Sequence, residues 1–183
     1  MRIATLAAVL GVLLAMLLPA SGRLEAAEVA PPAPAFTHAA QADWLNSSPL
    51  TWQQLRGQVV LLEFWTFACW NCDRSIPWVQ DLQKRLGVRG LRIVSVHTPE
   101  LARERVRANV VAAVAQRNVT WPVMLDDDYS YWNALGNQYW PAFYLVDKQG
   151  RVRASFAGET HIGDAQARSV QDALLKLLAE PAG

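Results

Sequence analysis

Cysteine and histidine are scarce in this sequence, and its charges are nearly balanced. The 183 residues include two cysteines and three histidines, and the formal net charge is +1. Because both cysteines lie in one motif, the chain lacks a scaffold of structural disulfides. The balanced charge gives no indication of nucleic acid or an acidic surface as a partner. A zinc site takes four ligands, and only His38, His97 and His161 could complete a shell begun by one cysteine pair.

Apolar residues and tryptophan, by contrast, are abundant. Hydrophobic residues make up 52% of the chain, which is enough for one domain with a sizeable core. Several of the eight tryptophans cluster around the cysteines, namely Trp65, Trp70 and Trp78. We therefore expect a large apolar surface beside the thiols as well as an ordinary core.

The chain is organised around one strand and the two cysteines that follow it. The apolar run Val59–Trp65 is typical of a buried central strand. Cys69 and Cys72 come next, at the start of a segment that is compatible with a helix. The helix dipole and the unpaired N–H groups at a helix N-terminus favour a thiolate there. The second thiol lies about one turn further along, close enough to form a disulfide with the first.

This pattern predicts thiol–disulfide exchange. Cys69 is the expected nucleophile, which forms a mixed disulfide with a substrate, and Cys72 is expected to resolve that intermediate. An inert structural disulfide and half of a metal site are alternatives for the same two residues.

Two other functions compete with this interpretation. A copper-binding or copper-delivery protein would use both thiols together with His97 or His161. A thiol peroxidase is suggested by Thr66-x-x-Cys69, but Leu62 stands where the peroxiredoxin pattern Pro-x-x-x-Thr-x-x-Cys has proline.

The stretch from Phe64 to Pro77 resembles the active site of thioredoxin-like proteins of the TlpA/ResA group. It is most similar to the thioredoxin-like domain of DipZ-type proteins, which carry Phe-Trp-Thr-x-x-Cys-x-Asn-Cys-x-Arg. The resemblance covers roughly residues 50–180. Further matching motifs follow in the same order: His97–Glu100, Trp121–Val123, Asp126–Tyr129, Trp132–Pro141 and Asp147–Gly150.

The resemblance implies a thioredoxin fold, an α/β fold with a central mixed sheet flanked by helices on both faces. It also implies a disulfide reductase that acts on disulfide-bonded or dithiol proteins and draws electrons from a membrane protein of the DsbD/CcdA kind. No cofactor is expected beyond the redox-active Cys69–Cys72 disulfide, and we expect a monomer. The Trp70–Asn71 pair between the cysteines adds neither charge nor histidine, which favours a reductant over an oxidant.

The N-terminal region reads as a targeting segment. Residues 1–27 combine a basic start, an apolar run and small residues, which is typical of a secretory signal peptide, or of an N-terminal anchor if they are not cleaved. Residues 28–43 are rich in proline and alanine and are expected to form a linker. Residues 44–183 would then form the thioredoxin-like domain, located in the periplasm or otherwise outside the cytoplasm.

Hydrophobic periodicity predicts the order of strands and helices after the motif. The expected helices cover residues 69–87, 101–117, 129–135 and 164–179. The expected strands cover residues 59–65, 91–96, 121–126, 142–146 and 151–156, the last two as a β-hairpin. This order is that of the thioredoxin arrangement.

Glu63 is an acid inside the apolar central strand, six residues before Cys69. Burial of a carboxylate is costly, so we expect its pKa to be raised. Thioredoxins carry an acid at the corresponding place. Glu63 is therefore expected to take the proton from Cys72 during resolution, through water. The alternative is a solvated Glu63 at the rim of the sheet.

Pro141 follows Trp140 and precedes a strand, and it resembles the cis-proline that faces the dithiol in thioredoxins. Such a bond would turn the backbone of Trp140 toward a substrate strand. A plain trans proline at a strand start is the alternative. Together with Trp65, Trp70 and Asn71, these two residues form the expected substrate-contact set.

Three further groups of polar residues lie outside the expected site. His97 follows a strand and is interpreted as a loop-capping residue rather than a catalytic one. Residues 126–128 are three consecutive aspartates, which we interpret as a solvated turn rather than a cation site. Glu159 and His161 follow the hairpin and receive no role. No metal site is expected.

Overall fold

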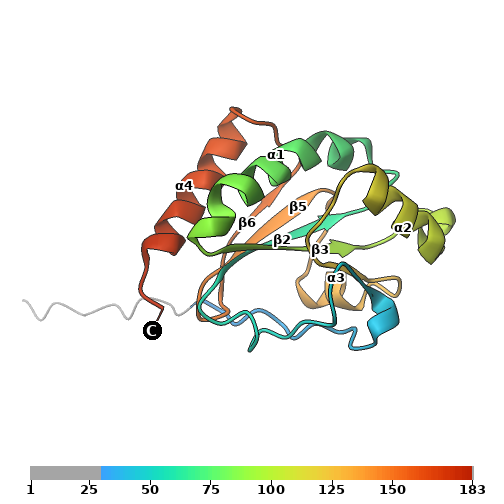
Figure 1. Cartoon of the computed structure of the whole chain (residues 1–183), viewed down its shortest axis with the longest axis horizontal. Coiled ribbons are helices and arrows are strands. Elements are labelled where there is room, and N and C mark those ends of the chain that lie inside the picture. Colours follow the sequence, from blue (N-terminus) through green and yellow to red (C-terminus); the bar gives the residue numbers. More distant parts are fainter. Residues whose placement is uncertain (1–29, 183) are drawn as a thin grey trace, which may run out of the picture.

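The computed structural model describes residues 30–182, in which a mixed sheet carries helices on both faces (Figure 1). The strand order is β1-β4-β3-β2-β5-β6. The strands are β1 (Trp44–Leu45), β2 (Val59–Trp65), β3 (Leu91–His97), β4 (Val123–Leu125), β5 (Ala142–Val146) and β6 (Val152–Ala157). The α-helices are α1 (Trp70–Leu86), α2 (Arg107–Gln116), α3 (Ser130–Ala134) and α4 (Ala165–Ala179).

Strand β2 lies inside the sheet and all of its residues are buried. Side chains alternate between the two faces of a strand. Val59, Leu61 and Trp65 accordingly belong to the core cluster beneath α1, whereas their even-numbered neighbours belong to the cluster on the opposite face. Glu63 shares the odd-numbered register, so its side chain points to the face that α1 covers.

The neighbours of β2 place two further residues beside Glu63. Strand β3 pairs with β2 in parallel and sets Ser95 opposite Glu63. Strand β5 pairs with β2 antiparallel and sets Phe143 on the other side. Strand β4 extends the sheet in parallel beyond β3, and β6 completes the hairpin with β5.

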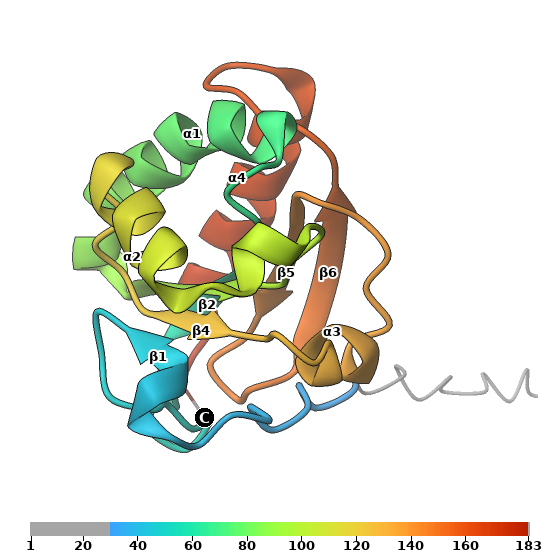
Figure 2. The same cartoon turned by 90° about the vertical axis from the view of Figure 1, so that its right-hand side faces the viewer.

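The two faces of the sheet are covered differently. Residues of α1, α2 and α4 contribute to one core cluster. Residues of α3 and of the segment between residues 33 and 55 contribute to the other. Figure 2 shows α3 and this segment on the side of the sheet away from α1 and α4.

The helix predicted for residues 101–117 is interrupted, so that prediction is wrong in part. A 3₁₀ helix, η3 (Ala102–Arg105), precedes Val106, whose backbone is extended with φ −82° and ψ 104°. The carboxylate of Glu104 accepts the N–H groups of Glu100 and Leu101 and holds this stretch in a tight turn. Val106 is therefore exposed.

Residues 30–43, the described part of the segment expected as a linker, pack against the domain. Pro32 forms a β-bridge with Arg151, and the N–H of Val152 donates to the carbonyl of Pro31 at 2.9 Å. Ala33 is buried, and the ring of Phe36 lies 4.9 Å from that of Trp52. The predicted signal peptide lies outside the described residues. Within residues 30–182, no helix combines the length and apolar character needed to cross a bilayer.

Candidate active site

The two cysteines lie at the N-terminus of α1 and differ in exposure. Cys69 is the N-cap residue, and its Sγ accepts the backbone N–H of Cys72 at 3.2 Å. The pair forms a disulfide with Cα atoms 5.2 Å apart. Cys72 is completely buried, whereas Cys69 is partly exposed. The pair therefore offers one accessible sulfur at the positive end of the helix and one protected sulfur behind it.

Glu63 is buried beneath α1 and does not lie at the rim of the sheet. Its Oε2 accepts the hydroxyl of Ser95 at 2.5 Å, and its Oε1 is buried without a hydrogen-bond partner among the described residues. Burial raises the pKa of Glu63 to about 7, and the Ser95 hydrogen bond opposes that rise. Glu63 is therefore able to take up or release a proton near neutral pH.

The peptide bond between Trp140 and Pro141 is cis. Pro141 is buried immediately before β5, and Trp140 is partly exposed. The indole Nε1 of Trp140 donates to the carbonyl of Thr98 at 3.0 Å, and its ring centroid lies 4.1 Å from that of Trp132. These contacts fix the large side chain of Trp140, so its backbone is held in one place.

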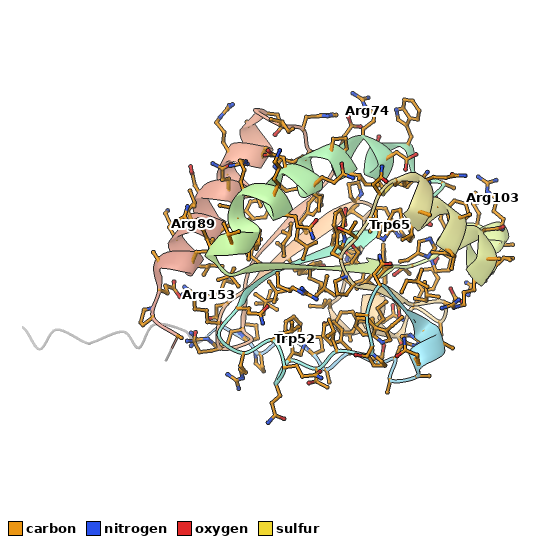
Figure 3. The ribbon with its side chains drawn as sticks, viewed as in Figure 1. Trp52, Trp65, Arg74, Arg89, Arg103 and Arg153 are labelled. Carbon is orange, nitrogen blue, oxygen red and sulfur yellow. A yellow bond between two sulfur atoms is a disulfide. The ribbon has the colours of Figure 1, made fainter. Side chains whose placement is uncertain are left out.

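The expected contact residues around the disulfide separate into exposed and buried ones. Trp70 and Asn71 are exposed, and the side chain of Trp70 retains 72% of its accessible surface. Trp65 is buried in the core, where it shapes the site from beneath, so direct contact between Trp65 and a substrate does not fit the structure. Figure 3 shows Trp65 inside the layers, whereas Arg74 and Arg103 point outward.

His97 is a buried strand residue and does not cap the following loop. Its ring lies 5.4 Å from Trp65 and 5.8 Å from Phe67, and its Nε2 lies 3.4 Å from the Thr66 hydroxyl. Burial lowers the pKa of His97 to about 4, against the opposing charge of Glu104. His97 is therefore neutral at physiological pH and forms part of the packing beneath the motif.

Glu104 is a site residue that the sequence did not reveal. Its side chain is fully buried, and its Oε1 accepts the N–H of Ala68, the residue before Cys69, at 2.7 Å. Burial raises its pKa, but hydrogen bonds from the Thr66 hydroxyl and from backbone N–H groups outweigh burial and leave the pKa below its usual value. The carboxylate is therefore ionised. A glutamate three residues after the N-cap can accept the N–H of the N-cap residue, as Glu104 does for Leu101, but Leu101 lacks the hydroxyl that completes a capping box, so the sequence signal was weak.

Arg117, at the end of α2, is the second site residue that the sequence did not reveal. Its guanidinium pairs with both oxygens of Asp73, in the first turn of α1, at 2.6 and 2.8 Å. It also donates to the carbonyl of Phe67 at 2.9 Å. Arg117 therefore fixes the start of α1 to the loop that precedes Cys69.

The solvated turn expected at residues 126–128 is wrong for Asp126, whereas Asp127 is partly exposed and Asp128 is exposed. Asp126 is fully buried and accepts the Thr98 hydroxyl at 3.0 Å and the backbone N–H groups of Tyr131 and Trp132. It orders the start of α3 and the loop after β3. His38 hydrogen-bonds to Asp126 at 3.3 Å, so these polar groups satisfy one another.

The loop after β6 lies against the first turns of α1. The N–H of Thr160 donates to the Ser75 hydroxyl at 3.0 Å, and Arg74 pairs with Glu159 at 3.0 Å. His161 contacts Glu159 through its Nε2. Glu159 and His161 therefore serve contacts within this loop and with α1.

Comparison with known proteins agrees with this geometry. The Redoxin family matches residues 28–174. Protein DipZ of Mycobacterium tuberculosis is 42% identical over 119 residues, which cover 63% of this chain and 17% of DipZ. Thiol-disulfide oxidoreductase YkuV of Bacillus subtilis is 31% identical over 116 residues, which cover 63% of this chain and 77% of YkuV. The match thus spans a small part of DipZ but most of YkuV.

A solved structure agrees in fold. A thiol:disulfide interchange protein DsbE from Chlorobium tepidum superposes with a TM-score of 0.69 at 21% identity, covering 82% of this chain and 97% of that one. The predicted thioredoxin fold is confirmed. The predicted enzyme class, thiol–disulfide oxidoreductase, is the one that the names of YkuV and of ResA from Geobacillus thermodenitrificans carry. Since the family match covers more than half of its length, the chain belongs to the Redoxin family, as a thioredoxin-like member of the TlpA/ResA group.

Proposed function

We propose that this protein is an extracytoplasmic disulfide reductase that acts on other proteins through Cys69 and Cys72. The observation that carries the proposal is the asymmetry of the pair. Cys69 is partly exposed at the N-cap of α1, and Cys72 is buried behind it within disulfide distance. An inert structural disulfide needs no such difference in access between its two sulfurs.

The reaction follows from this arrangement. The thiolate of Cys69 attacks a client disulfide, the client S–S bond breaks, and one client sulfur leaves as a thiolate. The thiol of Cys72 then loses its proton and attacks Sγ of Cys69. The second client sulfur leaves, and the Cys69–Cys72 disulfide forms. Two electrons pass from the protein to the client in each cycle.

Glu63 is the proposed acceptor of the Cys72 proton. It lies beneath α1 on the face that carries Cys72, and its pKa of about 7 lets it accept a proton at neutral pH. The backbone at the cis Trp140–Pro141 bond would pair with an extended client segment, and the exposed Trp70 and Asn71 would flank it.

The reducing direction is supported by the charges near Cys69. The residues between the cysteines are uncharged, and the carboxylate of Asp73 lies in the first turn of α1. The buried carboxylate of Glu104 bonds to the residue before Cys69. Negative charge near a thiolate disfavours it and makes the dithiol a stronger reductant, and Arg117 offsets only part of that effect.

Location and electron supply complete the proposal. The apolar N-terminal run supports export from the cytoplasm. A reductase outside the cytoplasm needs electrons from across the membrane, so the donor would be a separate membrane protein of the DsbD/CcdA kind. Client and donor would each meet a monomer at the Cys69 surface in turn. Fractionation of cells that express the full chain, with detection in the extracytoplasmic fraction, tests the location.

An insulin reduction assay with dithiothreitol tests the activity. The wild-type protein is expected to accelerate insulin precipitation, and Cys69→Ser and Cys72→Ser are each expected to return the rate to the uncatalysed level. The reduction potential is expected to lie nearer to that of thioredoxin, about −270 mV, than to that of DsbA, about −120 mV. An oxidising potential would contradict the reductase direction while leaving the enzyme class intact.

A trapping experiment identifies the client. Cys72→Ser is expected to retain mixed disulfides at Cys69, because the resolving sulfur is absent. Cys69→Ser is the matched control and should trap nothing. The copper alternative gains no support from the histidines, because His97 is buried against aromatic rings and His161 contacts Glu159.

A further inference from the structure

Three buried polar side chains form a hydrogen-bonded chain beneath α1. The indole Nε1–H of Trp121 donates to Ser95 Oγ at 2.6 Å. The hydroxyl of Ser95 donates to Glu63 Oε2 at 2.5 Å. All three residues are buried, so water does not compete for these bonds.

The chemistry of the three groups fixes the direction of this chain. An indole N–H can only donate, so Ser95 Oγ accepts at that contact. The single hydroxyl proton of Ser95 is then directed to Oε2 of Glu63. If Oε2 itself carried a proton, two hydrogens would lie between Oε2 and Ser95 Oγ. The Ser95 hydroxyl would then have to rotate away from Oε2. When Glu63 is ionised, Oε2 therefore accepts the Ser95 hydroxyl, and Oε1 is the oxygen left open to an incoming proton.

Oε1 is also the oxygen that is free to react. It is buried and has no hydrogen-bond partner among residues 30–182. Glu63 and Ser95 face each other across parallel strands, and both point into the core cluster that contains Cys72. Oε1 is thus free, while Oε2 of the same carboxyl group is hydrogen-bonded to Ser95 on β3.

In the described part of the chain, no charged side chain lies among the groups packed against Glu63 and Ser95. The buried titratable groups on the elements packed around Glu63 are Cys72 of α1, His97 of β3 and Tyr144 of β5, and Arg92 of β3 is exposed. Tyr144 points to the opposite face of the sheet, and β4 carries no titratable residue. The charged side chains of α1 and α4 are not buried. Ser95 is therefore the polar side chain that sets the state of Glu63.

We propose that Ser95, oriented by Trp121, is a positioning residue that reserves Oε1 of Glu63 for the proton released by Cys72. As Cys72 Sγ bonds to Cys69 Sγ, the bond from Cys69 to the client sulfur breaks and the electron pair leaves with that sulfur. The Cys72 proton passes to Oε1, while Oε2 keeps the Ser95 hydrogen bond. The inference rests on the proposed reductase function, because it assigns the oxygen that serves the resolution step.

Infrared spectroscopy of the oxidised protein tests which oxygen carries the proton. The C=O band of protonated Glu63 is identified by its loss in Glu63→Gln. If the proton lies on Oε1, the carbonyl oxygen is Oε2, which is hydrogen-bonded to Ser95. Ser95→Ala is then expected to move this band to higher frequency and to raise the titration midpoint by roughly one pH unit. An unchanged band or an unchanged midpoint in Ser95→Ala overturns the proposal.

Three further variants distinguish the loss of the Ser95–Glu63 hydrogen bond from a general loosening of the core. Ser95→Thr keeps the hydroxyl and is expected to restore the wild-type band and midpoint. Trp121→Phe frees the Ser95 hydroxyl to rotate and is expected to raise the titration midpoint of Glu63 by a smaller amount. If the midpoint does not change in Trp121→Phe, Trp121 does not orient Ser95. Ser75→Ala deletes another buried serine hydroxyl, which donates to Asn71, and is expected to leave the Glu63 band unchanged.

Single-turnover reduction of a peptide disulfide links the spectrum to the reaction. The pH profile of the resolution step is expected to move upward in Ser95→Ala by the same amount as the infrared midpoint. If the profile moves in Glu63→Gln but not in Ser95→Ala, the positioning role of Ser95 fails and the role of Glu63 stands. If the wild-type protein does not reduce insulin, the proposed function fails, whatever the infrared bands show.

Discussion

Glu104 and Arg117 hold opposite ends of one peptide group, the one that joins Phe67 to Ala68. The guanidinium of Arg117 donates to the carbonyl of Phe67 at 2.9 Å, and the N–H of Ala68 donates to the carboxylate of Glu104 at 2.7 Å. Cys69 is the next residue in the chain. The peptide that leads into the active-site helix is thus fixed between a positive and a negative side chain.

Glu104→Gln is expected to destabilise the protein by about 2–4 kcal/mol. The carboxylate accepts the N–H of Ala68 on one oxygen and those of Glu100 and Leu101 on the other. An amide has a single acceptor oxygen, so its NH₂ group would face a backbone N–H. Urea denaturation of the oxidised protein measures the change.

Glu100→Gln is the matched control for this prediction. Glu100 lies four residues away and is exposed, and only its backbone N–H takes part in the Glu104 contacts. The control is expected to stay within about 0.5 kcal/mol of wild type. Equal stability of the two variants would show that Glu104 does not hold the loop.

Glu63→Gln is expected to stabilise the protein above pH 7. The folded pKa of Glu63, about 7, lies above its ordinary value of 4.5. Folding therefore favours the protonated form, and the contribution of Glu63 to stability is full below pH 4.5 and is lost as pH rises through 7. The difference is about 3 kcal/mol in favour of the variant at pH 8 and vanishes near pH 4. Denaturation at both pH values measures it.

His97→Gln is expected to change the pH dependence of stability in the opposite direction. The folded pKa of His97, about 4, lies below its ordinary value of 6.5, so folding favours the neutral ring. Its contribution is full above pH 6.5 and is lost as pH falls through 4. The variant is expected to lose this acid sensitivity, which amounts to about 3 kcal/mol in the wild type.

Glu63 and His97 together predict how the stability of the wild-type protein depends on pH. Between about pH 4.5 and 6.5 their slopes oppose each other, so wild-type stability should vary little there. In the same window, Glu63→Gln should become more stable as pH rises, and His97→Gln should become less stable. Parallel slopes in the two variants would refute both assignments.

Trp70→Ala is expected to weaken client reduction without weakening the fold. The side chain is 72% exposed beside Cys69, so its removal should change stability by no more than about 0.5 kcal/mol. Loss of an exposed aromatic anchor is expected to raise KM for insulin about tenfold.

Val88→Ala provides the control for the loss of exposed apolar surface. Val88 is 92% exposed in the turn after the far end of α1. Its removal should leave KM unchanged. A similar rise of KM in both variants would indicate that exposed apolar surface, rather than the position of Trp70, governs client binding.

Strands β2 to β6, most helices and the dithiol could be read from the sequence because their signals are local. The apolar run of β2 and the three-to-four spacing in α1 each report directly on burial. Glu63 was also visible, since one acid in an apolar strand stands out.

The residues that hold the site could not be read in this way. Ser95 appears as one small polar residue in a strand, and Glu104 appears as a charge on a continuous helix. Their roles depend on contacts with Glu63 and Ala68, which lie 32 and 36 positions away. Asp126 was missed for the same reason, because its burial follows from the loop that packs over it.

The bridge between Pro32 and Arg151 fixes where the chain enters this domain. It brings the incoming chain onto the sheet at its β6 edge, and the following residues run along the face away from α1 (Figure 1). Any tether joined there would lie at the end of the sheet opposite the one that leads to Cys69. The end of the molecule that carries Cys69 would then face away from the tether.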